Sequence, residues 1–349
     1  MTGLKPVRKF FNTSMENEPM QINRGEADTG PPFVFGFGFK NGGAEEMRWE
    51  DTASHESEYD FVWLHLNMVN DEAREWIRAQ SHIPYAAASA LLAGETRPRV
   101  TAFDKGLVVN LRGVNLNEGA EPEDMVSIRI WLSEKMVVTT RRRRLKAAQD
   151  VRADINNGAR IENTGAIVSR LATKLTDRTE PYVLDVEDEV DALETAILEG
   201  GGDGLRSRLA DSRQTAVHFR RFIAPQREAL NRLALDESER FNHHIKTELR
   251  ETADRVTRMT EDIDAVRERA MVLQDQLADQ RAEEMNRNMM VLSIVAAIFL
   301  PLGFLTGLFG INVGGMPGVE SAAAFWIVSA ACLVVAGCLL VLFRIMKWL

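Results

Sequence analysis

Two long runs without a charged side chain close the sequence and limit its folding more than any other feature. No Asp, Glu, Lys or Arg occurs from Met289 to Gly310, and none occurs from Ala322 to Phe343. Each run has about 22 residues, and a helix of that length spans about 33 Å, enough for the hydrocarbon core of a bilayer. The sequence therefore predicts two membrane helices, at 289–310 and 322–343.

The charges that flank these runs predict an orientation. Basic residues precede the first run and follow the second, whereas the connecting segment 311–321 has no Lys or Arg. Basic flanks face the cytoplasm, so both termini are predicted to be cytoplasmic, with the short loop outside. The N-terminal residues lack the apolar core of a secretory signal. Cys332 and Cys338 both fall in the second run, so no disulfide framework is expected.

The first half of the chain alternates between strand and helix patterns. Segments 33–39, 59–66, 99–114 and 125–141 are β-like, and the last two resemble hairpins with turns at 104–106 and 133–135. Helical patterns occupy 71–80 and 84–94. A helical hairpin is predicted next, with one helix at about 161–198, a Gly-rich turn, and a second helix interrupted near Pro225. The predicted fold class is an α+β cytoplasmic domain, with a mixed sheet and flanking helices.

A very long helix is predicted to connect this domain to the membrane. No Pro or Gly occurs from 241 to 300, so one helix can extend from about Arg240 to Gly310. Apolar or small residues recur at alternating spacings of 3 and 4, which is typical of a coiled-coil seam; Thr252 alone interrupts it. The seam positions are Ile245, Leu249, Val256, Met259, Ile263, Val266, Ala270, Leu273 and Leu277.

Another face of the same helix carries two stripes that share a period of about 3.5 residues. Acids form the stalk stripe: Asp254, Glu261, Asp264, Glu268, Asp275 and Asp279. Mostly small or apolar residues continue it into the membrane: Asn286, Met289, Ser293, Ala296, Leu300, Gly303 and Gly307. If several copies surround an axis, the acids become rings that concentrate cations and the second stripe lines a pore. The alternative is a solvated polar face opposite the seam.

The first membrane run ends at Gly310, Ile311 and Asn312, which invites two interpretations. A ring of Asn312 amides can hold a hydrated divalent cation through its waters, because Mg²⁺ and similar hard cations release water reluctantly. Alternatively, Gly and Asn merely close a helix C-terminus, where both residue types are favoured. Gly303 and Gly307 likewise permit close helix packing, with or without a pore.

Other chemistry receives little support from the sequence. The histidines show no metal-ligand spacing, and the adjacent His243 and His244 point to different faces of a helix, which favours a surface role. The run 141–144 of arginines suits either phosphate or headgroup contact or a solvated strand end. No phosphate-binding loop, nucleophile elbow or HExxH motif occurs, so neither an enzyme nor an ATP-driven pump is expected. No cofactor and no nucleic-acid partner are predicted.

The ending LPLGFLTGLFGINVGGMPG, followed by a second apolar helix and a short basic tail, resembles the CorA superfamily of divalent-cation transporters. That family carries Gly-Met-Asn at the end of its first membrane helix, where this chain has Gly-Ile-Asn. The variant signature, with ETRPRV (95–100), RGVNLNEGAEPEDMVSIRIWL (112–132) and TRRRRL (140–145), resembles the zinc-associated ZntB branch. The resemblance extends over most of the chain from about residue 33.

The resemblance implies a funnel-shaped homopentamer in which each chain contributes one long helix to the stalk and pore. It implies that Asn312 forms a selectivity ring at the outer mouth, with Gly310 before it. Related proteins often have Thr and Met where this chain has Gly303 and Leu300, so a wider and less polar pore is expected here. The implied activity is zinc transport across a bacterial inner membrane, by proton-coupled uptake rather than efflux.

The leading hypothesis is therefore a pentameric zinc transporter, which would also accept Co²⁺, Ni²⁺ or Cd²⁺ and would sit in membrane lipid. The first alternative is a magnesium, cobalt or nickel channel, and the second is a membrane-tethered coiled-coil scaffold without transport. The predicted organisation is a flexible arm 1–32, an α/β domain 33–160, a helical hairpin 161–239, a stalk and first membrane helix 240–310, an external loop 311–321, a second membrane helix 322–343 and a tail 344–349.

Overall fold

A computed structural model describes residues 30–53, 58–94, 97–201, 204–310, 321 and 323–346. It divides into two compact units, which are described separately. The first comprises 1–188 and 214–266, and the second comprises 189–213 and 267–349. Three long helices contribute residues to both units. The predicted N-terminal arm lies almost entirely outside the described residues.

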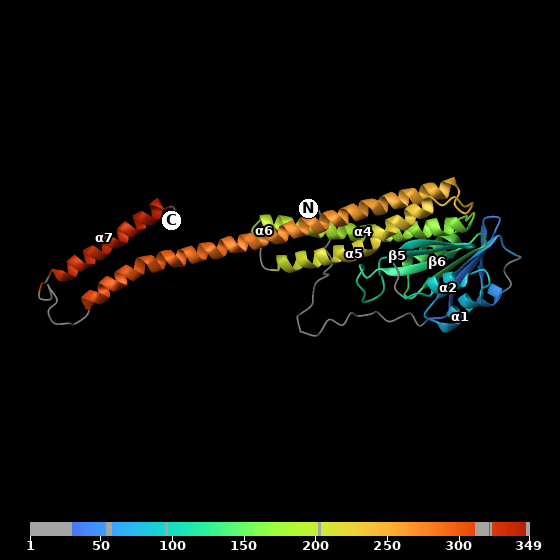
Figure 1. The fold of residues 1–349 in the computed structure, drawn as a ribbon, viewed down its shortest axis with the longest axis horizontal. Helices are drawn as coiled ribbons and strands as arrows, with labels where there is room; N and C mark the ends of the chain where they lie inside the picture. The colour runs from blue at the N-terminus through green and yellow to red at the C-terminus, as the bar shows by residue number, and fades with distance from the viewer. Residues whose placement is uncertain are drawn as a thin grey trace, which may run out of the picture. The chain divides into compact units, whose positions relative to one another are not determined.

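The first unit contains a seven-stranded mixed sheet with the order β2-β1-β3-β7-β6-β5-β4 (Figure 1). Neighbouring strands are antiparallel except β3 and β7, which are parallel. The predicted hairpins are confirmed, and the strand β2, whose residues are mostly exposed, escaped the sequence analysis. The strands are β1 Phe33–Lys40, β2 Gly43–Met47, β3 Phe61–Asn67, β4 Arg99–Phe103, β5 Gly106–Gly113, β6 Val126–Leu132 and β7 Met136–Arg141.

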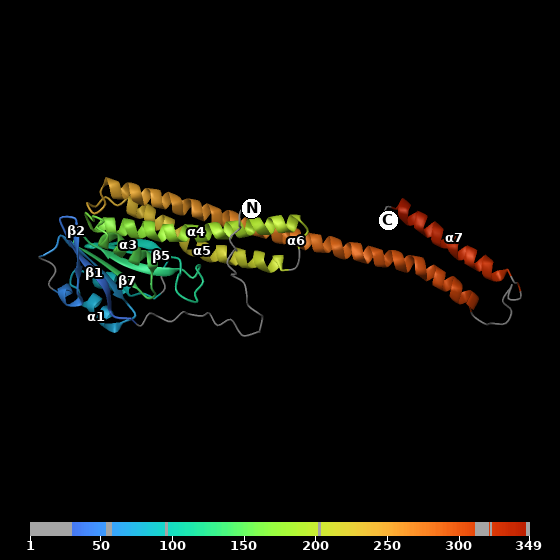
Figure 2. The same ribbon diagram turned by 180° about the vertical axis from the view of Figure 1, so that it is seen from behind.

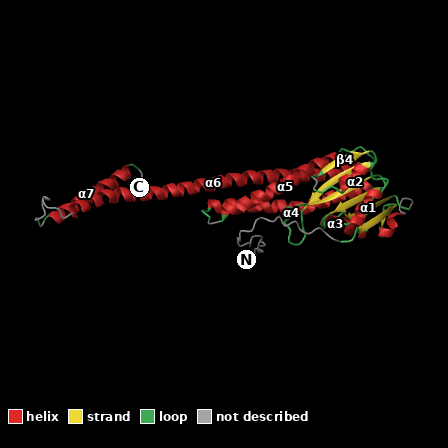
Figure 3. Ribbon diagram, turned by 60° about the horizontal axis from the view of Figure 1, so that its bottom comes forward, coloured by secondary structure: helices red, strands yellow, loops and turns green. Residues whose placement is uncertain are grey.

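Helices cover both faces of this sheet. On one face lie α1 (Asp71–Ala79) and α2 (Tyr85–Leu91) (Figure 3). Their buried Ile77 and Leu91 belong to an apolar cluster with Trp131 of β6. On the other face, α3 (Lys146–Asn156) places Arg152 over the ring of Phe35, 5.2 Å from its centroid. Because helices cover both faces of the sheet, the strands β3, β5 and β7 are buried along their whole length and do not alternate between buried and exposed residues.

The helical hairpin consists of α4 (Thr164–Leu198) and α5 (Leu205–Ala234), labelled in Figure 2. The predicted interruption near Pro225 is wrong, because α5 continues through this residue. A proline removes one backbone donor and crowds the preceding turn, which usually bends or breaks a helix. Here the neighbouring Phe219, Ile223 and Leu230 are all buried, so packing holds the helix together on both sides of the proline.

The predicted long helix is confirmed as α6, which extends from His243 to Gly310 and contains 68 residues. It begins a few residues after the predicted start, because the Asn242 side chain accepts a hydrogen bond from the Ile245 backbone nitrogen at 3.0 Å and caps it. The second apolar run forms α7 (Ala324–Ile345). Both α6 and α7 are long and apolar enough to cross a membrane, and almost none of either apolar stretch is buried within the chain.

Candidate cation pathway along helix α6

The membrane part of α6 presents the predicted pore stripe as an open surface of the chain. Leu300 is 75% exposed and Met289 is 54% exposed, although both are apolar. Off the stripe, Ile294 is buried, but other residues such as Leu292 are exposed too, so exposure is a property of the whole membrane part of α6 and not of the stripe alone. The remaining stripe residues are also exposed, namely Asn286, Ser293, Ala296, Gly303 and Gly307. Within the described residues the stripe therefore has no packing partner in its own chain, which leaves it available to lipid, water or another copy.

The glycines of this stripe are not required by packing inside one chain. A methyl group added at Gly303, Gly307 or Gly310 would meet no atom within 4 Å among the described residues. By contrast, one added at Gly113 of the sheet would clash with Leu175 of α4. Close approach to α7 of the same chain therefore does not explain the small residues in α6, and a role toward a second chain or an open path fits them better.

The only polar side chain of the stripe inside the membrane run is that of Ser293. Its hydroxyl donates to the backbone oxygen of Met289 at 2.9 Å, so its hydrogen is used within the helix. The oxygen retains a lone pair that faces outward, which is a weak ligand for a hydrated cation. Gly310 closes α6, and Ile311 and Asn312 lie outside the described residues, so their predicted role at the pore mouth stays a prediction.

The predicted stalk acids differ in their surroundings. Asp264 is half-buried and accepts a hydrogen bond from Arg220 of α5, so its charge is largely compensated. This ion pair also raises the pKa of Arg220. The other stalk acids are exposed: Asp254, Glu261, Glu268, Asp275 and Asp279. Five carboxylates per chain are therefore accessible to solvent and cations, as a cation-concentrating stripe requires.

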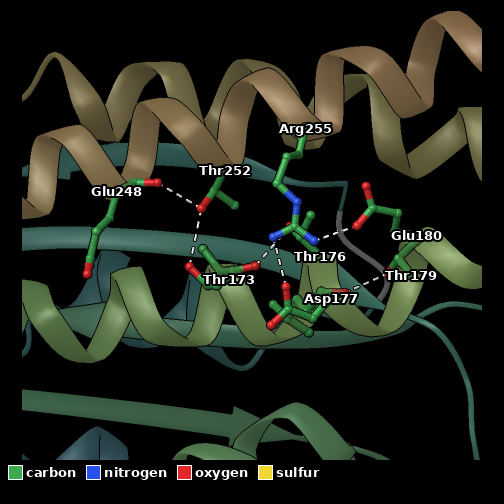
Figure 4. Close-up of polar contacts among 10 residues, drawn as sticks. Thr173, Thr176, Asp177, Thr179, Glu180, Glu248, Thr252 and Arg255 are labelled. Carbon is green, nitrogen blue, oxygen red and sulfur yellow. Dashed lines mark hydrogen bonds and ion pairs between the residues drawn. The ribbon is translucent and has the colours of Figure 1, made fainter.

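The apolar seam of α6 is packed inside the same chain. Leu249 and Val256 have no exposed surface, and the other seam positions up to Leu273 are buried too. Thr252, which interrupts the seam in the sequence, is also buried and hydrogen-bonds Thr173 of α4 at 3.2 Å (Figure 4). The seam therefore stabilises the three-helix arrangement of α4, α5 and α6, which leaves the acidic face as the one free for other contacts.

The adjacent histidines lie at the surface, where the sequence placed them. His243 and His244 are exposed on α6, and His244 lies 3.3 Å from Glu248 of the same helix. His65 is fully buried in β3, where burial first and the charge of Arg141 second lower its pKa to about 3. Across the described ranges, no group of three or more His, Cys, Asp and Glu side chains is arranged to hold a metal ion.

Sequence reasoning missed two features of this region. One is the buried hydroxyl ladder that joins α4 to α6, in which Ser169 also donates to Glu248 at 3.0 Å. The other is a pair of arginines on α6 that each hold two acids of α4. These arginines are Arg255 and Arg269, and their spacing of two heptads along α6 is the signal that could have revealed them, since such a spacing returns to the same helix face.

Comparisons with known proteins agree with this arrangement. A family described as "CorA-like Mg2+ transporter protein" matches residues 58–344. The "Divalent cation transporter CmaX" of Pseudomonas aeruginosa is 36% identical over 293 residues, which cover 82% of this chain and 87% of that protein. The "Zinc transport protein ZntB" of Yersinia enterocolitica is 34% identical over 263 residues, covering 75% of this chain and 80% of the relative.

The fold has a solved counterpart of the same length. The "structure of the full-length CmaX protein" superposes with a TM-score of 0.79 at 34% identity, covering 92% of this chain and all of that one. The mixed sheet, the long helix and the two C-terminal apolar helices therefore form one architecture with a known precedent.

Proposed function

This chain belongs to the family of CorA-like Mg2+ transporter proteins, and from that premise we propose that it takes up zinc across a bacterial inner membrane through the central pore of a homopentamer. Membership makes the chain a membrane transporter of divalent cations rather than an enzyme. Zinc as the cargo, five copies as the assembly, and cytoplasmic termini are the parts that we add. The predicted resemblance to the ZntB-like branch is confirmed by relatives of that name.

The exposed stripe on the membrane part of α6 is the observation that carries this proposal. Two membrane helices are too few to enclose a pore, so a transport path needs several chains around an axis. The stripe has small and apolar residues with no partner in its own chain. Placed around an axis, it forms a path wide enough for a partly hydrated cation, which Asn312 would select at the outer end.

The choice of zinc rests on relatives and not on ligands. No His, Cys, Asp or Glu occurs from Met289 to Gly310, so no side chain in the run prefers Zn²⁺ to Mg²⁺. The relatives named zinc transport protein support zinc. A pore without strong ligands would pass zinc quickly, because tight binding would slow its release.

Proton coupling follows from the same branch and has a physical constraint. The first membrane run has no ionisable side chain, so a coupled proton must travel with the metal, as water or hydroxide, or through the stalk. Asp275 and Asp279 are the exposed acids nearest the membrane on the stripe. We assign them the role of proton acceptors if the stalk takes part.

A second candidate is an uncoupled channel for magnesium, cobalt or nickel. The relative named divalent cation transporter favours it, because that name specifies no zinc preference. A stripe without acids or histidines suits outer-shell recognition of hydrated Mg²⁺ equally well. The two candidates differ in what drives the flux, and this difference can be measured.

Zinc flux into proteoliposomes tests the proposal directly. The full chain is reconstituted, and uptake of Zn²⁺ and Mg²⁺ is followed with and without an imposed pH gradient. We expect gradient-stimulated zinc uptake that falls at least about tenfold on Asn312→Leu, because the outer amide ring is lost. Asn288→Leu is the matched control, since it is the same exchange on α6 about 100° away from the stripe, and it should retain most of the flux.

Other outcomes would change the assignment. Magnesium flux that ignores the gradient would establish the channel and reject coupling. Equal losses with Asn312→Leu and Asn288→Leu would remove the selectivity role of Asn312. No flux of either ion from a correctly assembled protein would leave the membrane-tethered scaffold.

A further inference from the structure

Helices α4 and α6 are parallel neighbours with a constant register. Thr173 contacts Thr252 (Figure 4), and Ser169 contacts Glu248 one turn earlier; each pair is separated by 79 positions in the sequence. Parallel helices that keep one offset present matching faces to each other at every heptad. The contacts of one turn therefore predict those of the next.

Arginines of α6 clamp pairs of acids on α4 at this register. In the first unit, Arg255 binds Asp177 at 2.8 Å and Glu180 at 2.6 Å, with separations of 78 and 75 positions. In the second unit, Arg269 binds Asp191 at 2.6 Å and Glu194 at 2.7 Å, and its separation from Glu194 is again 75 positions. Each guanidinium thus joins two carboxylates of α4, and we call each such set a rung.

Asp262 occupies the position midway between the two arginines, one heptad from each. Counting back the same 78 and 75 positions from Asp262 gives Leu184 and Glu187 of α4. At this rung an acid therefore stands where the neighbouring rungs have a base. Leu184 is 48% exposed, although apolar residues elsewhere in this helix, such as Val183 and Val190, are buried. Among the described residues, no ion pair joins α6 to α4 at this middle rung, whereas an arginine joins them at the other two.

The surroundings of Asp262 disfavour its charge. Burial first, then the charge of Glu261, raises its pKa; Arg258 opposes this rise, and Glu180 of α4 adds to it. On another side of α6, the Asp264 carboxylate next to α5 is paired with Arg220 and contributes little net charge. The charge of α4 that acts on Asp262 is therefore that of Glu180, and the base that acts on it is Arg258 of α6, which is exposed.

We propose that the rung at Asp262 responds to protons. The pairing of α4 with α6 is weaker there when the Asp262 carboxylate is charged, and stronger when the carboxyl is protonated. A neutral carboxyl removes the repulsion from Glu180 and Glu187 and can donate a hydrogen bond to one of them. The packed state binds the proton more tightly than the separated helices, so pairing is strongest at low pH. It weakens as the pH rises through the packed-state pKa of Asp262.

Hydrogen exchange of the full-length protein tests this proposal without reference to its cargo. Amide exchange in 181–188 of α4 and 258–266 of α6 is compared between variants at the same pH, so that the chemical exchange rate cancels. We expect Asp262→Asn to slow exchange in both segments about two- to fivefold near neutral pH and to make no difference near pH 4. Asp262→Arg should slow it at least as much, because it completes the rung with Glu187.

Glu268→Gln is the matched control, because it removes the same charge from an exposed position of α6 that lies outside the rung. It should change exchange less than about twofold. Equal protection by Glu268→Gln and Asp262→Asn would overturn the proposal and leave only a general effect of net charge. Faster exchange in Asp262→Arg would overturn it too, since no acid of α4 would then face this position.

Discussion

The two halves of helix α6 follow different rules although they form one continuous helix. In the half that belongs to the first unit, apolar residues are buried against α4 and α5, and buried threonines are hydrogen-bonded. In the membrane half, residues as large as Leu300 and Phe299 are about two-thirds or more exposed. The apolar surface of the first half is covered by its own chain, and that of the membrane half is not.

This difference shows how one helix can serve both as a structural element and as a candidate pathway. An apolar surface in water must be covered within the chain, because its exposure costs about 25 cal/mol per Å². In a bilayer the lipid provides the cover, so an apolar stripe can stay available for other copies. Substitutions should therefore act on folding in one half and on transport in the other.

The largest effect on folding is expected from Leu249→Ala in the packed half. Leu249 has no exposed surface, so its truncation leaves a cavity among α4, α5 and α6. We expect the free energy of unfolding to fall by about 2–5 kcal/mol. Denaturation of the full chain in detergent, followed through buried Trp63 and Trp131, measures it. A loss below about 0.5 kcal/mol would mean that the seam is not packed.

Acid should destabilise the first unit through protonation of His65, by nearly as much as the Leu249→Ala substitution does. Its folded-state pKa is lowered to about 3, so the unfolded chain takes up a proton more readily below about pH 6.5. Stability is therefore present above pH 6.5 and is lost as the pH falls toward 3, by about 3 kcal/mol at pH 4.

His65→Phe should reduce the fall in the free energy of unfolding between pH 6.5 and pH 4, because Phe cannot take up a proton. The ring can still stack on Phe35, whose centroid lies 4.8 Å from that of His65. The hydrogen bond between His65 and Thr139 is lost in this variant, which should lower the free energy of unfolding at neutral pH by about 1 kcal/mol. An unchanged loss of stability at low pH in this variant would assign the pH dependence to other groups.

The smallest effect on folding is expected from Gly303→Ala in the membrane half. The added methyl meets no atom within 4 Å, and alanine is the better helix former by about 1 kcal/mol. We expect stability unchanged or slightly raised, while zinc flux in liposomes falls because the pore narrows. The contrast between the two halves would be contradicted if Gly303→Ala lowered the stability while the folded fraction of the variant transported zinc at an unchanged rate.

Much of the fold could be predicted because the patterns were long and unopposed. Uncharged runs predicted both membrane helices, and the absence of breakers predicted α6. The hairpins followed from turn residues flanked by β-branched runs. Pro225 misled the prediction, because its local preference for a break is outweighed by buried neighbours distant in sequence. The strand β2 was missed because its Gly-Ala-Glu-Glu-Met sequence has little strand preference and depends on β1 for pairing.

For the candidate site, the sequence could identify a stripe but not its surroundings. The period of about 3.5 residues places Asp254 and Asp264 alike on the acidic face. Only the structure reveals that Arg220 of α5 pairs with Asp264 and leaves Asp254 exposed. Such pairs join residues far apart in sequence, so no local pattern reports them.

By itself, the sequence determined the membrane helices, the length of α6 and the faces of that helix, because charge, breakers and periodicity act over a few turns. Tertiary structure alone decided which face of α6 is covered within the chain and which stays open. It also decided the pairing of β3 with β7, and the packing that brings Asp262 under the influence of Glu180 of α4. These features depend on contacts between distant segments, whose energies arise only when the chain has packed.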